Sequence, residues 1–271
     1  MKKILAGCLL SSLSLIAFAE SELIMKQTPY ADSAWQKFNP NHCGGMDKTK
    51  IPQGSTVILV DTYTCKLPPT NVKFEFVQVA YGGDIYYMNK LSAGITDNDM
   101  QKVNTLTESE KEQLKKDALT KSMMLKLDGV EKVLNDVKRT SVFGISLMKS
   151  SVYDESEVTE GTGIEMQYLN STKKRIKYVT AVVVGYNGVD DPVKASFTRK
   201  YEVVLKGVGP IEPDETATYK KEYAWHTDVV EYIKIKSIKV DYMDGTSKTI
   251  TKPESARLKE STIKSIETGA Y

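Results

Sequence analysis

The segment VVEYIKIKSIKVDYMDG, residues 229–245, decides the fold of the C-terminal half of the chain. Its apolar residues alternate with polar ones, as in a strand with one buried face, but in two phases: Ile233 and Ile235, then Ile238, Val240 and Tyr242. An inserted residue would keep both sets on one face, so we predict a β-bulge near Lys236-Ser237. Asp244-Gly245 then predicts a type I′ hairpin turn.

The flanking sequence extends this pattern into a second, all-β domain at residues 141–252. Clusters of Gly, Pro, Asn and Asp separate short apolar segments at regular spacing, which is typical of a β-sandwich. The predicted strands are 142–153, 162–169, 175–187, 199–206, 217–226, 229–236 and 237–243. Residues 253–271 form a polar C-terminal tail, predicted as a short helix or a frayed end.

Residues 96–140 predict a helical linker. Thr107-Glu108-Ser109-Glu110 is a capping box, in which residues 107 and 110 satisfy each other's backbone N–H groups. Apolar residues follow at helical spacing, and Asp128-Gly129 divides them into one long helix or two short ones. We expect this face to pack on the chain's own sheets; the alternative is a coiled-coil surface for a partner.

Residues 20–95 predict a first β domain with an extended lead-in at 20–42, which Trp35 and Phe38 would attach to it. In 56–61 both alternating faces are apolar enough to be partly buried. A second strand, 74–79, is followed by Gly82-Gly83, a hairpin signal. A returning strand at 85–88 completes the predicted hairpin, and Pro68-Pro69 excludes a ladder strand between the first two.

The N-terminus predicts export. Two lysines, a short apolar segment and the motif Ala17-Phe18-Ala19 form a signal peptide at residues 1–19, with cleavage between Ala19 and Glu20. The apolar segment is shorter than the roughly 20 residues of a membrane span, and no transmembrane segment is expected in the mature chain. A short anchor, or lipidation of Cys8, is the alternative. The expected location is periplasmic or secreted.

Net charge and cysteine content exclude one class of function and predict a disulfide. The chain has 37 basic and 35 acidic residues, and removing Lys2 and Lys3 leaves 35 of each, so the mature chain is formally neutral. It therefore lacks the basic field that nucleic-acid binding requires. Cys43 and Cys65 predict a disulfide in an oxidising compartment. A metal site that includes His42 is the alternative, but it lacks further ligands at ordered spacing.

Two stretches resemble known families. Ile51-Pro52-Gln53-Gly54-Ser55-Thr56-Val57, followed by the hairpin of residues 76–88, resembles a bacterial Src-homology-3-like domain over about 43–95. This resemblance implies a small barrel whose aromatic cleft binds extended peptides or cell-wall stems. The cysteine pair and the Pro68-Pro69 loop depart from that pattern.

The second resemblance covers about 141–252. Residues 163–179, with Asn170-Ser171-Thr172 and Ile176-Lys177-Tyr178, and then Tyr186-Asn187 and Asp191-Pro192-Val193, are similar to immunoglobulin-like domains of the FxLYD kind in exported bacterial proteins. The four residues that give that family its name are not present. The resemblance implies an immunoglobulin-like β-sandwich and carries no catalytic residues.

Motifs for catalysis and cofactors are lacking. The sequence contains no nucleophile elbow, P-loop, zinc-protease helix or C-x-x-C motif, so we predict no cofactor and no catalytic residue. Asp97-Asn98-Asp99 and Asp190-Asp191 offer oxygen ligands for calcium, but neither continues into an EF-hand loop, so we interpret both as plain turns. Asn170-Ser171-Thr172 is formally a glycosylation site, and we interpret it as a strand-end turn. Trp225-His226 is interpreted as core and rim.

One aromatic cluster is the candidate ligand surface: Tyr63, Tyr81, Tyr86 and Tyr87. Tyrosines of this kind either bind a ligand or fill a barrel core and its rim. The sequence therefore predicts an exported, non-catalytic binding or adaptor protein of the bacterial envelope, with peptidoglycan or an envelope protein as partner. The alternatives are a secreted hydrolase with a carboxylate pair and a structural subunit of an envelope assembly.

Overall fold

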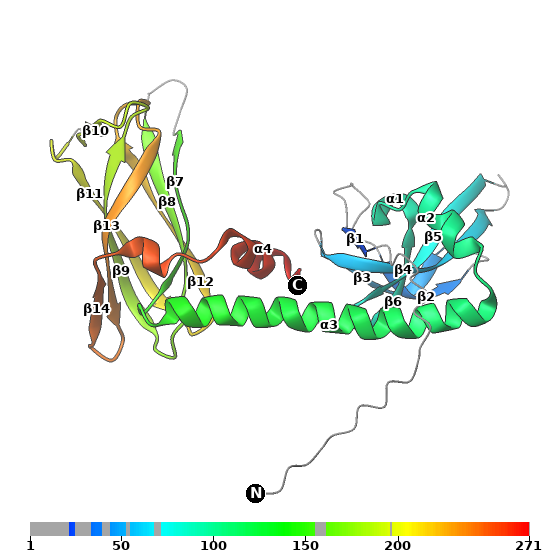
Figure 1. The fold of residues 1–271 in the computed structure, drawn as a ribbon. Helices are drawn as coiled ribbons and strands as arrows, with labels where there is room; N and C mark the ends of the chain where they lie inside the picture. The colour runs from blue at the N-terminus through cyan, green and yellow to red at the C-terminus, as the bar shows by residue number, and fades with distance from the viewer. Residues whose placement is uncertain are drawn as a thin grey trace, which may run out of the picture. The chain divides into compact units, whose positions relative to one another are not determined.

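The computed structural model describes residues 22–24, 34–39, 44–52, 55–67, 72–154, 161–195 and 197–270. The protein is mainly β, with three antiparallel sheets and one long helix (Figure 1). It divides into an N-terminal unit up to Lys126 and a C-terminal unit from Leu127 onward, so that the boundary falls inside the long helix. Each unit is described by itself below.

The N-terminal unit contains one six-stranded sheet in the order β1-β4-β5-β6-β2-β3. Its strands are β1 (Glu22–Ile24), β2 (Ala34–Asn39), β3 (Gly44–Thr49), β4 (Thr56–Leu67), β5 (Val72–Tyr81) and β6 (Asp84–Asn89). Among the described strands no pairing joins β1 to β3, so a closed barrel is not shown there. The predicted lead-in supplies β1 and β2. Trp35 of β2 packs on Phe76, with ring centroids 5.9 Å apart, whereas the side chain of Phe38 lies outside the described residues.

Helices cover both faces of this sheet, as the apolar pattern of residues 56–61 predicts. One face packs on α1 (Lys90–Ala93) and α2 (Asp97–Asn104), and the other packs on the first half of α3 (Glu108–Ser141) (Figure 1). In β4, Val57 and Leu59 join the first core, whereas Ile58 and Val60 join the second core together with Ala118 of α3. The hairpin at Gly82-Gly83 is confirmed: both glycines take positive φ, 60° and 90°.

The helix α3 is a single helix that continues through Asp128-Gly129. The capping box at its start is confirmed, because the Thr107 N–H donates to Glu110 Oε2 (2.7 Å) and the Glu110 N–H donates to Thr107 Oγ1 (3.3 Å). Residues 96–140 contribute to the cores of both units: Ala118 is buried in the N-terminal unit, and Val137 packs on a small core of the C-terminal unit. Packing on the chain's own sheets is thus confirmed for these positions.

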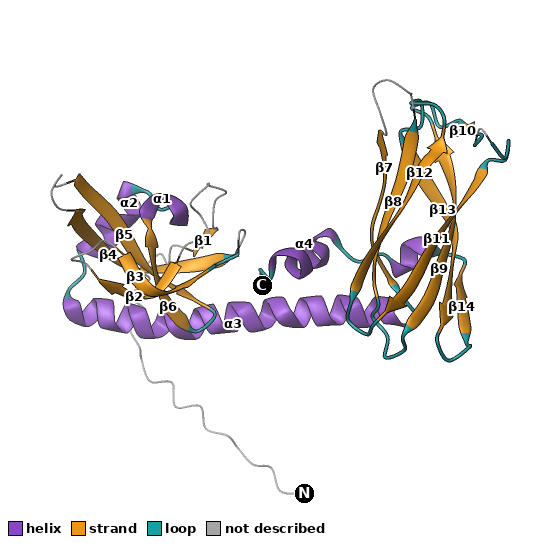
Figure 2. Ribbon diagram, turned by 180° about the vertical axis from the view of Figure 1, so that it is seen from behind, coloured by secondary structure: helices purple, strands orange, loops and turns teal. Residues whose placement is uncertain are grey.

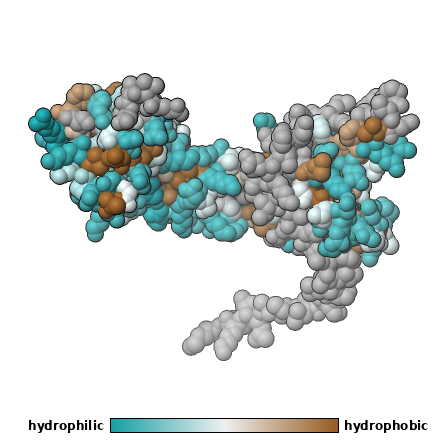
Figure 3. All heavy atoms as spheres, turned by 90° about the horizontal axis from the view of Figure 1, so that it is seen from above, coloured by the Kyte–Doolittle hydropathy of each residue, from teal (hydrophilic) through white to brown (hydrophobic). Residues whose placement is uncertain are grey.

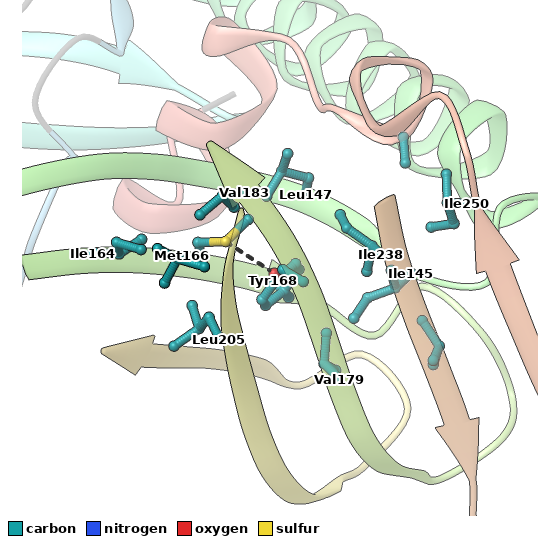
Figure 4. Close-up of a cluster of buried hydrophobic side chains, with 14 of the residues drawn as sticks. Ile145, Leu147, Ile164, Met166, Tyr168, Val179, Val183, Leu205, Ile238 and Ile250 are labelled. Atoms are coloured by element: carbon teal, nitrogen blue, oxygen red, sulfur yellow. Dashed lines mark hydrogen bonds between the residues drawn. The ribbon is translucent and has the colours of Figure 1, made fainter. Parts of the chain in front are cut away.

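The C-terminal unit consists of two sheets around one shared core (Figure 2). One sheet has the order β12-β8-β7, and in the other β9 pairs with β10, β11 and β13, and β13 pairs with β14. The strands are β7 (Ser146–Asp154), β8 (Thr162–Leu169), β9 (Ile176–Tyr186), β10 (Pro192–Val193), β11 (Glu202–Ile211), β12 (Thr216–Trp225), β13 (Tyr232–Tyr242) and β14 (Ser247–Ile250). Ile164, Met166, Val183 and Leu205 meet between the sheets (Figure 4).

The segment quoted at the outset forms one bulged strand. Ile235 pairs with Val183 and Ser237 pairs with Val182, so Lys236 is the extra residue. The insertion keeps Ile233, Ile235, Ile238, Val240 and Tyr242 on the core face. The bulge is therefore confirmed.

The hairpin that follows is also present, but the predicted turn type is wrong. A type I′ turn needs positive φ at both Asp244 and Gly245, and only Gly245 adopts it, at 84°. The Gly245 N–H donates to the Tyr242 carbonyl (3.2 Å). Glycine accordingly serves as the left-handed residue that follows a tight turn.

The C-terminal tail folds back onto the second half of α3. It forms the short 3₁₀ helix η1 (Pro253–Ala256) and α4 (Glu260–Thr268), so the helical alternative is confirmed. Asp136 of α3 is buried and accepts hydrogen bonds from the Lys259 N–H (2.8 Å) and from Arg139 Nε (2.9 Å). Burial raises the pKa of Asp136, but these hydrogen bonds outweigh burial and hold the pKa below its ordinary value.

The sequence Asn170-Ser171-Thr172 has a structural role, which depends on Asn170. Its side chain is fully buried, and Nδ2 donates to the carbonyls of Lys174 (2.8 Å) and Ile211 (3.0 Å). Oδ1 accepts from the Thr172 N–H (3.1 Å). This network ties the β8–β9 turn to the end of β11, as expected of a strand-end turn.

We predict that Asn170→Ala destabilises the protein by about 3 kcal/mol, because each buried carbonyl that loses its donor costs roughly 1–3 kcal/mol. Urea unfolding followed by circular dichroism measures this change. Asn187→Ala is the control, since Asn187 lies in a partly exposed turn and only accepts, from the Val189 and Asp191 N–H groups. An equal loss in both variants would contradict the role assigned to Asn170.

Candidate functional site

The four predicted tyrosines lie on β4, β5 and β6 but do not form one cluster. Consecutive strand residues point to opposite faces, so Tyr86 and Tyr87 are separated by the sheet. Tyr87 is opposite Gln78 and Tyr86 is opposite Val79. The structure therefore brings the tyrosines together as two pairs, Tyr63 with Tyr87 and Tyr81 with Tyr86.

The first pair is half-buried. The rings of Tyr63 and Tyr87 meet edge to face with centroids 5.4 Å apart, and Gln78 Nε2 donates to Tyr87 Oη (2.7 Å). Burial raises the pKa of the Tyr63 phenol far above its ordinary value, and the nearby Asp61 carboxylate adds to this effect. Tyr63 is thus a neutral phenol at any physiological pH. Trp35 and Phe76, which the sequence did not assign to a site, lie on the same face.

The second pair is closer to the core. Tyr81 is only 9% exposed, its ring centroid lies 6.3 Å from that of Tyr86, and Lys126 Nζ lies 5.6 Å from it. Burial raises the pKa of Tyr86 as well. These contacts favour packing over ligand binding for this pair, and a ligand role for any of the four tyrosines stays a prediction.

Three other predicted positions cannot be placed. Ala19, Glu20 and Cys43 lie outside the described residues. Cys65 is buried in β4, at 3% exposure. The signal cleavage and the pairing of Cys43 with Cys65 therefore stay predictions.

A shallow hollow of about 290 Å³ lies where β5 meets β6 and α1, between Phe74, Glu75 and Leu91. Lys90 occupies its wall and forms ion pairs with Glu75 (2.6 Å) and with Asp97. Hydrogen bonds from Lys90 to Asp97 and Glu75 raise the pKa of its ammonium group. The charge of Lys90 is thus paired with two carboxylates, and Lys73 also lines the hollow. Asp99, the other half of the suggested calcium motif, closes a capping box with Thr96 at the start of α2.

An exposed aromatic cluster lies in the C-terminal unit, and the sequence did not predict it as a site. Phe197, in the loop before β11, is 84% exposed. Its ring meets His226 edge to face with centroids 4.6 Å apart, and His226 stacks on Tyr223 at 5.6 Å with an interplanar angle of 11°. We call Phe197, Tyr223 and His226 the aromatic end. In the view from above, hydrophobic residues are visible among hydrophilic ones on this unit (Figure 3).

The residue before His226 in the chain, Trp225, is held in the core. Trp225 is fully buried, and its Nε1 donates to the Val193 carbonyl (3.2 Å). Gly185 makes room for this ring, since a Cβ there would lie 2.5 Å from Trp225 Cζ2. Trp225 is therefore a core residue, as predicted, and His226 is exposed at the rim.

Tyr223 has an unusual backbone. Its φ is +46°, in the left-handed region, and the pairing of β12 with β8 shifts register between Lys221 and Trp225. A bulky residue rarely adopts this conformation, which costs about 1–2 kcal/mol. Such strain is often retained where function requires a particular side-chain position. The sequence gives little indication of this left-handed backbone, because Tyr223 lies in a predicted strand and tyrosine is common in strands.

The described residues contain no group of three or more His, Cys, Asp or Glu side chains arranged to hold a metal ion. Within the same residues, no helix has both the length and the apolar character needed to cross a bilayer.

The comparisons with known proteins leave the family open. No model of a protein family matches the sequence, and no curated protein matches it. Among solved structures, the chain is similar to IrmA from Escherichia coli, with a TM-score of 0.28 and 12% identity over 42% of this chain and 87% of that one.

We predict that Tyr223→Gly leaves the protein about 1–2 kcal/mol more stable than Lys221→Gly does, because both variants gain the freedom of glycine but only the first relieves a left-handed backbone. Chemical unfolding measures this change. Lys221→Gly, at an exposed position of the same strand with ordinary backbone, is the control and should destabilise by about 0.5–1 kcal/mol. A loss of stability in Tyr223→Gly equal to that of the control would show that the tyrosine position is not strained.

Proposed function

We propose that this chain is an exported, non-catalytic binding or adaptor protein of the bacterial envelope, and that it binds its partner through the aromatic end. The observation that carries the proposal is Phe197, which is 84% exposed yet packs edge-on against an aromatic stack. Exposing a large apolar ring in water is unfavourable, so its retention in a polar loop favours a binding role.

The geometry suits recognition of a protein or an extended peptide. Aromatic side chains provide large contact area at low entropic cost, and they dominate binding energy when a partner excludes water from them. Here, the contacts among the three rings restrict them before binding, which lowers the cost of ordering them in a complex.

The strand order supports an immunoglobulin-like assignment for the C-terminal unit. One sheet contains β7, β8 and β12, and the other contains β11, β9, β13 and β14, around one core. In immunoglobulin-like sandwiches the loops at the ends carry binding surfaces. For the N-terminal unit we propose a small Src-homology-3-like barrel; the strongly paired β4, β5 and β6 support its central part.

A second candidate is a structural subunit of an envelope assembly. The observation that favours it is a set of apolar residues on α3 that are more than half exposed: Met123, Met124, Leu127 and Leu134. Exposed apolar stripes on helices commonly pair with other helices.

The binding proposal is tested by crosslinking and pull-down. The mature protein is incubated with solubilised envelope proteins and, separately, with purified peptidoglycan. We expect one partner to be recovered by the wild type and by Tyr63→Ala/Tyr87→Ala, and to be lost at least ten-fold in Phe197→Ala/Tyr223→Ala. The ten-fold change corresponds to roughly 1.4 kcal/mol, a typical contribution for an aromatic hot spot.

Other outcomes distinguish the alternatives. Loss in the Tyr63/Tyr87 variant alone would move the site to the N-terminal unit, and loss in Met124→Lys/Leu134→Lys alone would favour the assembly subunit. Saturable sedimentation with peptidoglycan that survives every variant would contradict binding through the aromatic end.

Export and the disulfide form one further proposal. In an oxidising compartment Cys43 and Cys65 would pair, and the closed loop would contribute roughly 3 kcal/mol in the chain-entropy model. We predict that the mature protein, purified from the periplasm and unfolded in denaturant, has no free thiol by thiol titration, and that Cys65→Ala lowers the denaturation midpoint. Two titratable thiols would contradict the pairing.

A further inference from the structure

The strand β11 has an open side. It pairs with β9 over residues 202–208 in unbroken register, and the described residues contain no strand hydrogen-bonded to its other side. An edge strand presents unpaired backbone N–H and C=O groups, which can pair with another strand. Bulges, prolines and charges usually prevent this. On β11 the register shift and Pro210 come only after Val208, so the stretch from 202 to 208 is regular.

The outward face of this stretch reads Glu202, Val204, Lys206 and Val208. All four side chains are exposed, and the valines are 49% and 65% exposed. On β9 the residues opposite the first three are Val184, Val182 and Thr180. Neither Glu202 nor Lys206 therefore has an opposite charge across its own sheet. Lys206 Nζ lies 4.4 Å from the ring centroid of Tyr178, which carries no formal charge.

The order of these residues is self-complementary. If two copies of the strand lie antiparallel with a two-fold axis at Val204, Glu202 of one copy is opposite Lys206 of the other, and Lys206 is opposite Glu202. The two Val204 side chains meet at the axis. Directly opposed residues in an antiparallel pair share one face and interact, and opposite charges there are stabilising. An isologous interface requires this kind of symmetry.

We propose that β11 pairs with β11 of a second copy of this chain, so that the two four-stranded arrays β14-β13-β9-β11 form one continuous sheet across a two-fold axis. Backbone hydrogen bonds supply the affinity, and the Glu202–Lys206 pairs fix the register. The inference does not depend on the proposed binding function, because it uses a different surface.

Charge reversal tests the register, because a double reversal restores the opposite charges that each single reversal removes. Glu202→Lys and Lys206→Glu each place like charges opposite one another twice, and we expect each to weaken dimerisation about ten-fold, since each pair contributes up to roughly 1 kcal/mol. The double variant Glu202→Lys/Lys206→Glu restores opposite charges and should dimerise as the wild type does. An equimolar mixture of the two single variants should form heterodimers. Analytical ultracentrifugation of the mature protein measures all four.

A cysteine pair tests the axis. Val204→Cys should crosslink to a second copy with a short bismaleimide, because residue 204 faces itself. Val208→Cys is the matched control: it is an exposed valine on the same face of the same strand, but the two-fold axis places it opposite residue 200. Circular dichroism confirms that the variants are folded.

A wild-type protein that stays monomeric at the highest soluble concentration would overturn the proposal. Lys206 would then be a charge that keeps the edge strand from pairing with another chain. A dimer that ignores charge reversal, or crosslinks equally at 204 and 208, would also overturn it, since another surface would then be responsible.

Discussion

The C-terminal unit depends on one constraint: β13 has to keep its apolar side chains on the core face although the chain contains an extra residue. A strand alternates strictly between two faces, so a single insertion without a bulge would turn Ile238, Val240 and Tyr242 toward solvent. The bulge at Lys236 absorbs the insertion. The core between the sheets, the pairing with the central strand β9 and the hairpin to β14 all follow from that local adjustment.

The same alternation has a different consequence in the N-terminal unit. There both faces of β4 are apolar, so the sheet requires cover on both sides, and helices provide it. Because α1, α2 and the first half of α3 cover the two faces, the helical segment up to Lys126 is part of this unit. The tyrosines of β5 and β6 are divided between the two faces for the same reason, which separates what the sequence suggests as one cluster.

The two surfaces proposed for binding, the aromatic end and the outward face of β11, both lie next to buried core residues in the chain. Trp225, next to His226 in the chain, is buried in the core, and the core residues Val203 and Leu205 hold the outward face of β11 in place. At Tyr223 the backbone is strained while the side chain is exposed. Interior packing does not require that combination, which is why these surfaces are favoured over the hollow near Lys90, where the Lys90 ammonium group is already paired with Glu75 and Asp97.

The sequence by itself determined much of what depends on neighbours along the chain: strands β7, β8, β9, β11 and β12, the bulge at Lys236, the capping box at Thr107 and the glycine hairpin at Gly82. It missed β10 and β14 and divided β13 into two strands. Periodicity and backbone preference are local, so they can be read from order alone. The turn type at Asp244, the burial of Asn170, the separation of Tyr86 from Tyr87 and the meeting of Phe197 with His226 were decided only by the tertiary structure. These depend on which distant segments pack together, because contacts between residues far apart in the chain leave no periodic signal in it.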